Sequence, residues 1–271
     1  MPSQAMQDAI DVLRDRRKAG ASQPPPTLAE RRAAFTPGNR LHRVPDDVLV
    51  TDVSAGGVPA HWLAARLGRA SGMRVLFPDY RLAPEHPFPA ATDDVLAAWR
   101  WLHAGQGLSA RSIAVAGDSA GGGLAVALLV ATRDAGQAVP AAAVLMSPTV
   151  DLTSSGASMT ERADQDPVST PAMLAQFASD YLAGADPKTP LASPLFAALA
   201  GLPPLLIQVG TADLLLSDAE RLAAAAARAG VDVTLEIGEG LPHVYQLLLG
   251  TPEAAQATEQ IGTFLRARVL S

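Results

Sequence analysis

The alternation of short apolar segments with helical segments constrains the fold of this chain more than any other feature. Strand-like runs are expected at residues 48–54, 73–78, 112–117, 141–147, 205–210 and 231–237. Helical patterns are expected at residues 92–103, 120–135, 171–182, 217–229 and 252–268. Apolar strands joined by helical crossovers form a mostly parallel sheet that helices cover on both faces. The sequence therefore predicts an α/β fold.

Two segments depart from this alternation. Residues 4–18 and a second stretch that begins at Thr27 have helical spacing, and both precede any strand; Glu30 stands three residues after Thr27, as in a capping box. Residues 150–203 hold several prolines and one helical pattern but no convincing strand. We therefore expect cap helices over residues 1–40 and one α/β domain over 41–271, with a cap insertion at about 150–203.

Composition excludes several classes of function. The formal net charge of −6 argues against nucleic acid or an anionic membrane as a partner. The chain has no cysteine, which excludes disulfides, thiolate metal sites and a cysteine nucleophile. No apolar run reaches the roughly 18 residues of a membrane span, and the first eight residues do not resemble a signal peptide. We expect a cytoplasmic protein without a membrane partner.

A Gly-x-Ser-x-Gly sequence at residues 117–121 lies between a predicted strand and a predicted helix. In that context the glycines permit a sharp turn, and the turn lifts the Ser119 hydroxyl clear of the sheet. The following helix places backbone N–H groups beside it. Two other interpretations are a phosphate-binding glycine loop, which lacks a following Gly-Lys-Ser/Thr here, and a purely structural turn. Ser119 is the predicted nucleophile.

His243 is the predicted general base. In a hydrolase of this type the order along the chain is serine, acid, histidine, and of the five histidines only His243 follows Ser119. It lies in a loop after the strand predicted at residues 231–237, and an imidazole can take up and return a proton near neutral pH. The four earlier histidines (His42, His61, His86 and His103) are interpreted as structural or solvent-exposed.

The acid that orients this imidazole should follow a late strand. Asp213 stands directly after the apolar strand predicted at residues 205–210. Asp218 is the rival, but we expect it to lie inside a helix capped by Ser217. Asp213 is the favoured acid, and three residues adjacent to the predicted triad are the expected substrate contacts: Asp118, Leu214 and Val244.

The chain resembles the hormone-sensitive-lipase-like family of bacterial esterases. The resemblance rests on Asp-Tyr-Arg-Leu-Ala-Pro-Glu at residues 79–85 with its continuation to Ala90, on Gly-Asp-Ser-Ala-Gly-Gly at 117–122, and on Pro242-His243. It covers residues 45–270. It implies an α/β-hydrolase sheet, a helical cap and hydrolysis of carboxylic esters with short to medium acyl chains. No metal or cofactor is implied, and a homodimer is plausible on the same resemblance.

One departure from the family concerns the oxyanion hole. The family carries His-Gly-Gly-Gly upstream of Asp-Tyr-Arg-Leu, and this sequence has no such segment: residues 56–60 resemble the family's first β-turn, and residues 61–67 are expected to pass straight into a helix. About 30–40 residues are missing, enough for two short strands. The slot between the strands at 73–78 and 112–117 must therefore close up, be filled by another segment or subunit, or belong to a part of the molecule outside this sequence.

The missing segment leaves Ala120 N–H as the identifiable oxyanion donor, and the loss of one donor typically costs about 10²–10³ in rate. The predicted function is a serine carboxylesterase acting on a small-molecule ester through an acyl-enzyme. The alternative from another class is an impaired or non-catalytic ligand binder on the same fold; within enzymes, an amidase or lactonase is the rival. Four apolar cap residues either shape the substrate pocket or only pack: Met159, Met173, Phe177 and Tyr181.

Overall fold

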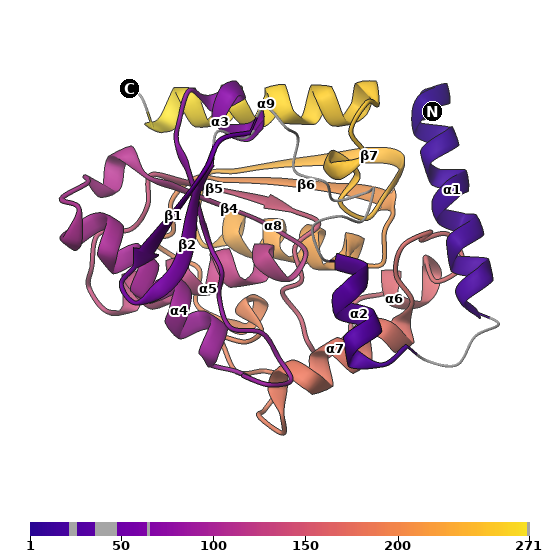
Figure 1. The fold of residues 1–271 in the computed structure, drawn as a ribbon, viewed down its shortest axis with the longest axis horizontal. Helices are drawn as coiled ribbons and strands as arrows, with labels where there is room; N and C mark the ends of the chain where they lie inside the picture. The colour runs from indigo at the N-terminus through magenta and orange to yellow at the C-terminus, as the bar shows by residue number, and fades with distance from the viewer. Residues whose placement is uncertain (22–25, 36–47, 64–65, 270–271) are drawn as a thin grey trace.

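The strands in the described part of the chain form two separate sheets. The computed structural model describes residues 1–21, 26–35, 48–63 and 66–269 (Figure 1). The first sheet is parallel, and its strands follow one another in the order β4-β5-β6-β7. Its members are β4 (Ala114–Asp118), β5 (Ala142–Met146), β6 (Leu205–Ala212) and β7 (Val233–Pro242). Every residue of β5 but the last is buried, as expected for a strand that is covered on both faces.

The second sheet is antiparallel and has the order β1-β2-β3. Its strands are β1 (Val50–Ala55), β2 (Val58–Leu63) and β3 (Val75–Pro78). Gly56 and Gly57 join β1 to β2 with φ angles of +65° and +91°, which is the conformation that a two-residue hairpin requires. The prediction that residues 61–67 pass directly into a helix is wrong for its first part, because residues up to Leu63 pair with β1 and β3.

One edge of β4 has no partner among the described strands. Ala141 N–H donates to the carbonyl of Ile113 at 2.8 Å, so the odd-numbered residues of this strand face β5. Because backbone groups alternate in direction along a strand, those of Ala114 and Ala116 point to the opposite side. In the described part of the chain, no strand pairs with that side.

The free edge of β3 faces the same space. Asp79 N–H donates to Pro59 at 2.8 Å, so the odd-numbered positions of β3 face β2 and the backbone of Leu76 points away from it. Pro78, on that same edge, has no N–H to leave unpaired, which is the position in a sheet where proline is tolerated.

The space between β3 and β4, here called the inter-sheet slot, is a cavity of about 330 Å³ lined by residues 75–78 of β3 and 113–118 around β4. An adjoining cavity of about 510 Å³ is lined by the beginnings of both strands, residues 73–76 and 112–116. The slot therefore lies where the family's additional strand was expected, and the two flanking strands do not close up onto each other.

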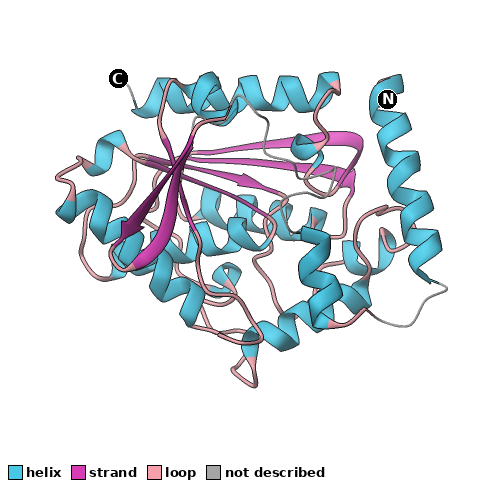
Figure 2. Ribbon diagram, viewed as in Figure 1, coloured by secondary structure: helices cyan, strands magenta, loops and turns pink. Residues whose placement is uncertain are grey.

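Helices cover both faces of the parallel sheet (Figures 1 and 2). On one face lie α4 (Ala90–Arg100), which continues into a π-helical turn (Trp101–Gly105), α5 (Ala120–Asp134) and α8 (Leu216–Arg228). On the other face lie α3 (Arg66–Ser71) and α9 (Pro252–Val269), which pack against each other. Short 3₁₀ turns occupy Ala110–Ser112, Pro194–Phe196 and Tyr245–Leu247.

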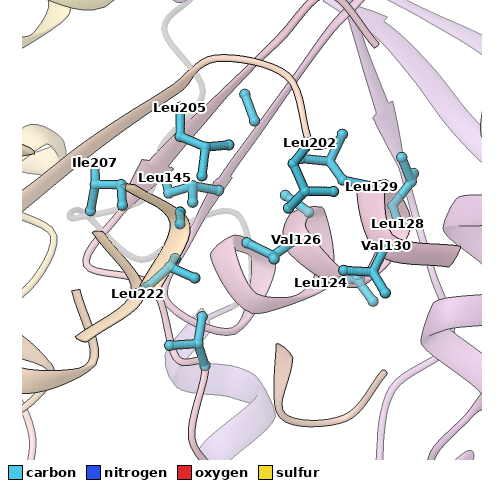
Figure 3. Close-up of a cluster of buried hydrophobic side chains, with 14 of the residues drawn as sticks. Leu124, Val126, Leu128, Leu129, Val130, Leu145, Leu202, Leu205, Ile207 and Leu222 are labelled. Atoms are coloured by element: carbon cyan, nitrogen blue, oxygen red, sulfur yellow. The ribbon is translucent and has the colours of Figure 1, made fainter. Parts of the chain in front are cut away.

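Successive side chains along each strand point to opposite faces of the sheet, so the core is divided into two clusters. Leu145, Leu205 and Ile207 pack with the leucines and valines of α5 and with Leu222 of α8 (Figure 3). The residues between them, including Val144 and Leu206, pack against Ile261, Phe264 and Leu265 of α9. Each fully buried leucine or isoleucine contributes about 1.5–3 kcal/mol through removal of apolar surface from water.

The segments expected to form the cap hold the helices α1 (Gln4–Ala21), α2 (Leu28–Phe35), α6 (Ser158–Glu161) and α7 (Pro171–Leu182). The expected capping box opens α2: Thr27 N–H donates to Glu30 at 2.7 Å, and Glu30 N–H donates to the Thr27 hydroxyl at 3.2 Å. An ion pair of 3.0 Å between Arg31 and Asp180 joins α2 to α7. The two parts of the cap therefore contact each other.

One local prediction is wrong. Ser217 was expected to cap α8, but the helix begins at Leu216 and its N-cap residue, Leu215, makes no side-chain cap hydrogen bond. The hydroxyl of Ser217 instead accepts a hydrogen bond of 3.0 Å from Ser158 N–H in the cap insertion. Within the described residues, no helix is both long and apolar enough to cross a membrane.

Candidate active site

Ser119, Asp213 and His243 follow the carboxyl ends of three strands of the parallel sheet. Ser119 comes directly after β4, Asp213 after β6 and His243 after β7. Parallel strands deliver their carboxyl ends to one edge of the sheet, where ligands bind in open α/β folds. The strand order therefore brings together residues that lie up to 124 positions apart in the chain.

Ser119 occupies a strained turn between β4 and α5. Its φ is +51° and its ψ is −119°, a backbone conformation that residues other than glycine rarely adopt. The turn is held by Ser119 N–H, which donates to Met146 at 2.9 Å. A Cβ at Gly117 would lie 2.1 Å from the carbonyl oxygen of Gly121, so only glycine fits there. A Cβ at Gly121 would meet nothing within 4 Å, and so the second glycine of the motif is not required by crowding.

The pairing of β6 with β7 places Asp213 beside His243. Ala212 pairs with Pro242, one residue before each of them, after an irregularity in register that follows Gly210. At this irregularity the two chains approach so closely that a Cβ on Gly210 would lie 1.9 Å from the carbonyl oxygen of Leu241. The His243 loop is also tied to the end of β5, because Val244 N–H donates to the Ser147 hydroxyl at 3.1 Å.

The three side chains form a continuous chain of hydrogen bonds. His243 Nε2 lies 3.1 Å from Ser119 Oγ, and His243 Nδ1 lies 3.1 Å from each carboxylate oxygen of Asp213. With the proton on Nδ1, the imidazole donates to Asp213 and its Nε2 accepts from the serine hydroxyl. The side chain of Asp213 is fully buried and that of His243 is 9% exposed, so water competes little for these bonds.

Two opposing effects act on the pKa of His243. Burial lowers the pKa of the imidazole, because it disfavours the charged form. The charge of Asp213 and its hydrogen bond to Nδ1 oppose this, and Asp166 and Asp118 add further negative charge. The net result is a pKa raised above the ordinary value of 6.5.

Asp218, the alternative candidate for the acid, binds backbone N–H groups of another segment. It lies within α8 and is fully buried. Its Oδ2 accepts backbone N–H groups from Val150 and Asp151 at 2.9 and 3.0 Å. Burial is the main reason why the pKa of this carboxyl rises to about 7. The carboxylate that contacts His243 is that of Asp213.

Ala120, the expected oxyanion donor, is the first residue of α5. The N–H groups of the first helical turn have no partner within the helix, and they carry the positive end of its dipole. Ala120 lines the same pocket as Ser119. Its N–H group is therefore positioned at the start of a helix beside the nucleophile, where an oxyanion would develop.

A pocket of about 200 Å³ opens beside Ser119. Three of the four apolar cap residues named from the sequence line it: Met159, Phe177 and Tyr181. Met173, the fourth, is not among the lining residues. The remaining wall includes Leu124 of α5 and Leu191 of the cap insertion. The pocket is mainly apolar and suits an acyl or alkyl group.

Residues 80–83 supply a wall of this pocket that the sequence had not assigned to the site. Arg81 holds their loop in place, because both its backbone N–H and its guanidinium donate to Asp94, at 2.8 Å in each case. The signal was present in the sequence, since these residues belong to the motif at 79–90 that identified the family resemblance. The position of this loop in the pocket that Ser119 also lines, however, depends on the packing of elements that are distant in the sequence.

The three expected substrate contacts lie in different surroundings. Asp118 is exposed and lines the inter-sheet slot. Leu214 is fully buried and packs with Leu215 and Met159. Its neighbour Leu215 lines the pocket beside Ser119, and Leu214 is not among the lining residues. Val244 is 7% exposed and has a φ of +48°.

The other described histidines do not line the pocket beside Ser119. His61 contacts Asp52 at 2.8 Å, His103 contacts the carbonyl of Leu108 at 2.8 Å, and His86 is exposed. His42 falls outside the described residues. Across the described ranges, no group of three or more histidine, aspartate and glutamate residues could hold a metal ion.

Comparison with known proteins identifies the family. Residues 53–247 match the model of a family with the α/β hydrolase fold. An acetyl-hydrolase of Streptomyces hygroscopicus is 49% identical over 207 residues, which are 75% of this chain and 68% of that protein. An esterase of Acinetobacter venetianus is 35% identical over 204 residues, 74% of this chain and 67% of its own length. The crystal structure of an esterase from the bacterial hormone-sensitive lipase family superposes with a TM-score of 0.92 at 40% identity, covering 99% of each chain.

Proposed function

This chain belongs to the α/β-hydrolase family and is a carboxylic ester hydrolase, and we propose that Ser119, His243 and Asp213 are its catalytic triad. The observation that carries the proposal is the unbroken hydrogen-bond chain from Ser119 Oγ through His243 to Asp213, with 3.1 Å at each contact. A serine on a strained turn, a buried imidazole and a buried carboxylate are the parts that acyl transfer requires.

The proposed reaction proceeds through an acyl-enzyme. His243 Nε2 removes the hydroxyl proton of Ser119 as Oγ attacks the ester carbonyl, and the imidazolium is stabilised by Asp213. The same imidazolium then returns the proton to the departing alcohol. A water molecule, deprotonated by His243, attacks the acyl-enzyme, and collapse of the second tetrahedral intermediate releases the acid and restores the serine hydroxyl.

The raised pKa of His243 sets the pH dependence of this reaction. A general base must be unprotonated, so the active fraction of enzyme falls as the pH drops through the pKa of the imidazole. Because this pKa is raised above 6.5, the acid limb of the kcat/KM profile is expected to have its midpoint above pH 6.5. Burial opposes this rise, while the charge and hydrogen bond of Asp213 and the charges of Asp166 and Asp118 cause it.

The pocket beside Ser119 supports esters with short to medium acyl chains as the substrate class. Its volume of about 200 Å³ accommodates a short alkyl or acyl group, and its walls are mainly apolar. The cap residues Met159, Phe177 and Tyr181 form the wall that a longer acyl chain would reach first. Polar contacts near the carbonyl come from Ala120 N–H, which we assign to the oxyanion hole.

Hydrolysis of p-nitrophenyl acetate by the wild-type chain and by Ser119→Ala tests the proposal. We expect p-nitrophenol release from the wild type, and a fall of more than about a thousandfold in kcat for Ser119→Ala, since only the oxyanion donor and binding remain. Ser179→Ala, which removes an exposed hydroxyl of α7 outside the pocket, is the matched control. Equal rates for wild type and Ser119→Ala would end the assignment.

One observation favours an impaired enzyme or a ligand binder as a second candidate function. The inter-sheet slot is lined by Gly117, Asp118 and Gly121 and so adjoins the turn that carries Ser119. Within the described residues, Ala120 supplies the one oxyanion donor that we can identify, and the loss of one donor costs about 10²–10³ in rate. A wild-type chain that binds a non-hydrolysable ester analogue in calorimetry but shows no turnover above Ser119→Ala would support this alternative.

A further inference from the structure

Leu214 follows the predicted acid, and the cap insertion binds both its backbone N–H and its backbone carbonyl. Leu214 N–H donates to Asp166 Oδ2 at 3.0 Å, and the Leu214 carbonyl accepts from the Ser158 hydroxyl at 2.5 Å. Both polar side chains are buried, with Asp166 at 0% and Ser158 at 2% exposure. Neither residue belongs to the sheet that carries Ser119, Asp213 and His243.

Asp166 is itself held firmly. Its Oδ1 accepts N–H groups from Val168 at 2.7 Å and from Ser169 at 2.8 Å. Arg17 of α1 donates to the backbone carbonyls of Asp166 and Ala163. Burial and the charge of Asp213 raise the pKa of this carboxyl, and the three backbone N–H groups that it accepts oppose that rise by favouring the ionised form. The contacts from Val168, Ser169 and Arg17 fix where the carboxyl lies.

Ser158 extends the same attachment to α8. Its hydroxyl accepts from Ser217 N–H at 3.0 Å, and its own N–H donates to the Ser217 hydroxyl at 3.0 Å. The loop from Asp213 to Ser217 therefore contacts the cap insertion through a reciprocal pair of hydrogen bonds as well as through Leu214. These bonds are neutral, whereas Asp166 contributes a charge.

From this arrangement we propose that Asp166 is a positioning residue for the acid–base pair: it fixes the loop of Asp213 through Leu214 N–H and places a second buried carboxylate at the residue next to Asp213. The inference rests on the proposed triad. It assigns to the cap insertion a part in catalysis that is separate from shaping the substrate pocket.

Among the described residues, three carboxyl groups favour the imidazolium: Asp213 from the loop after β6, Asp166 from the segment before α7, and Asp118 from the end of β4. Burial first, and then the charge of Asp213, raise the pKa of the Asp166 carboxyl, and Arg17 contacts the backbone carbonyl of Asp166. Arg162, whose backbone carbonyl accepts from Asp166 N–H, directs its guanidinium to Gln165 at 3.0 Å.

NMR titration of the His243 imidazole tests the proposal without requiring turnover. The measurement compares wild type, Asp166→Asn, Asp164→Asn and Ser158→Ala. Asp164 is exposed on the same segment, so its variant makes the same charge change away from the site. We expect a lower imidazole pKa in Asp166→Asn, because a negative charge that stabilises the imidazolium is gone, and an unchanged value in the other two variants.

Kinetics with p-nitrophenyl acetate measure the positioning part. In Asp166→Asn one side-chain atom that accepted an N–H becomes a donor, so we expect kcat to fall between about tenfold and a hundredfold with little change in KM. The acid limb of the pH profile should move to lower pH. Ser158→Ala should lower kcat without moving that limb, and Asp164→Asn should change neither.

The outcomes separate this proposal from the proposed function. An unchanged imidazole pKa in folded Asp166→Asn overturns the electrostatic part, and a lower melting temperature with unchanged kcat and pH profile shows that Asp166 is only structural. If Asp166→Asn does not fold, an unchanged kcat in Ser158→Ala overturns the positioning of the loop. Absence of turnover in the wild type counts against the esterase, while the titration still decides the role of Asp166.

Discussion

The two sheets of this molecule differ in how completely their strands are paired. In the parallel sheet, β5 and β6 have a partner on each side, and the core on both faces is closed by helices. In the region of the inter-sheet slot, β3 and β4 each present an edge without a described partner. Ser119 stands at the boundary, since β4 pairs with β5 on one side only. The three residues of the proposed triad all follow strands of the parallel sheet, whereas the turn that carries Ser119 and the proposed oxyanion donor adjoins the slot.

The largest expected effect comes from the two glycines that flank Ser119. Gly117→Ala places a Cβ 2.1 Å from the Gly121 carbonyl oxygen, so the turn must shift; we expect kcat to fall by at least about a hundredfold, because misplacement of a reacting group by about 1 Å has that effect. Gly121→Ala meets open space and should keep the wild-type melting temperature. Kinetics and thermal unfolding of both variants measure this difference.

An equal loss of melting temperature in Gly117→Ala and Gly121→Ala would contradict the described turn. It would mean that the surroundings of Gly121 are as crowded as those of Gly117.

A second prediction compares one apolar side chain from each sheet. Leu145 of β5 is fully buried, and Leu145→Ala should destabilise the fold by about 2–5 kcal/mol through lost contacts and a cavity. Phe77 of β3 is 52% exposed at the slot, and Phe77→Ala should change stability by less than about 0.5 kcal/mol. Urea unfolding of the two variants measures both values. A cost for Phe77→Ala near that of Leu145→Ala would show that the slot is a packed core.

The smallest effect concerns backbone amides and leaves activity untouched. Ala114 and Ala116 point into the slot, whereas Ala143 N–H donates to Pro204 at 2.9 Å inside the parallel sheet. We expect the first two amides to exchange with solvent more than about tenfold faster than that of Ala143, because exchange protection follows hydrogen bonding and burial. Residue-resolved hydrogen exchange by NMR checks this, and equal protection would mean that another segment pairs with β4.

Much of the fold could be predicted because it depends on local patterns. Apolar runs such as residues 205–210 and the helix that begins at Ala120 carry their own periodicity, and the serine motif has a fixed place between a strand and a helix. The strand β2 was missed because its pairing is set by the Gly56-Gly57 turn and by β3. Its sequence alone resembles the start of a helix.

The site could be predicted only where a residue type has few rivals. His243 is the one histidine after Ser119, and Asp213 follows a strand directly. Asp166 has no such signal: it lies in an irregular segment among other acidic residues, and its place beside Leu214 results from the packing of the cap insertion on the loop after β6. Contacts of this kind between distant irregular segments leave no periodicity in the sequence.

The most direct test of the central claim is the rate at which a fluorophosphonate labels Ser119, measured by mass spectrometry in the wild type and in His243→Ala. The account predicts covalent labelling of Ser119 in the wild type and a rate at least about a hundredfold lower in His243→Ala, since general-base catalysis contributes about 10²–10⁴. Labelling at the same rate in both proteins would contradict it, because the imidazole of His243, 3.1 Å from Ser119 Oγ, would then not activate the serine.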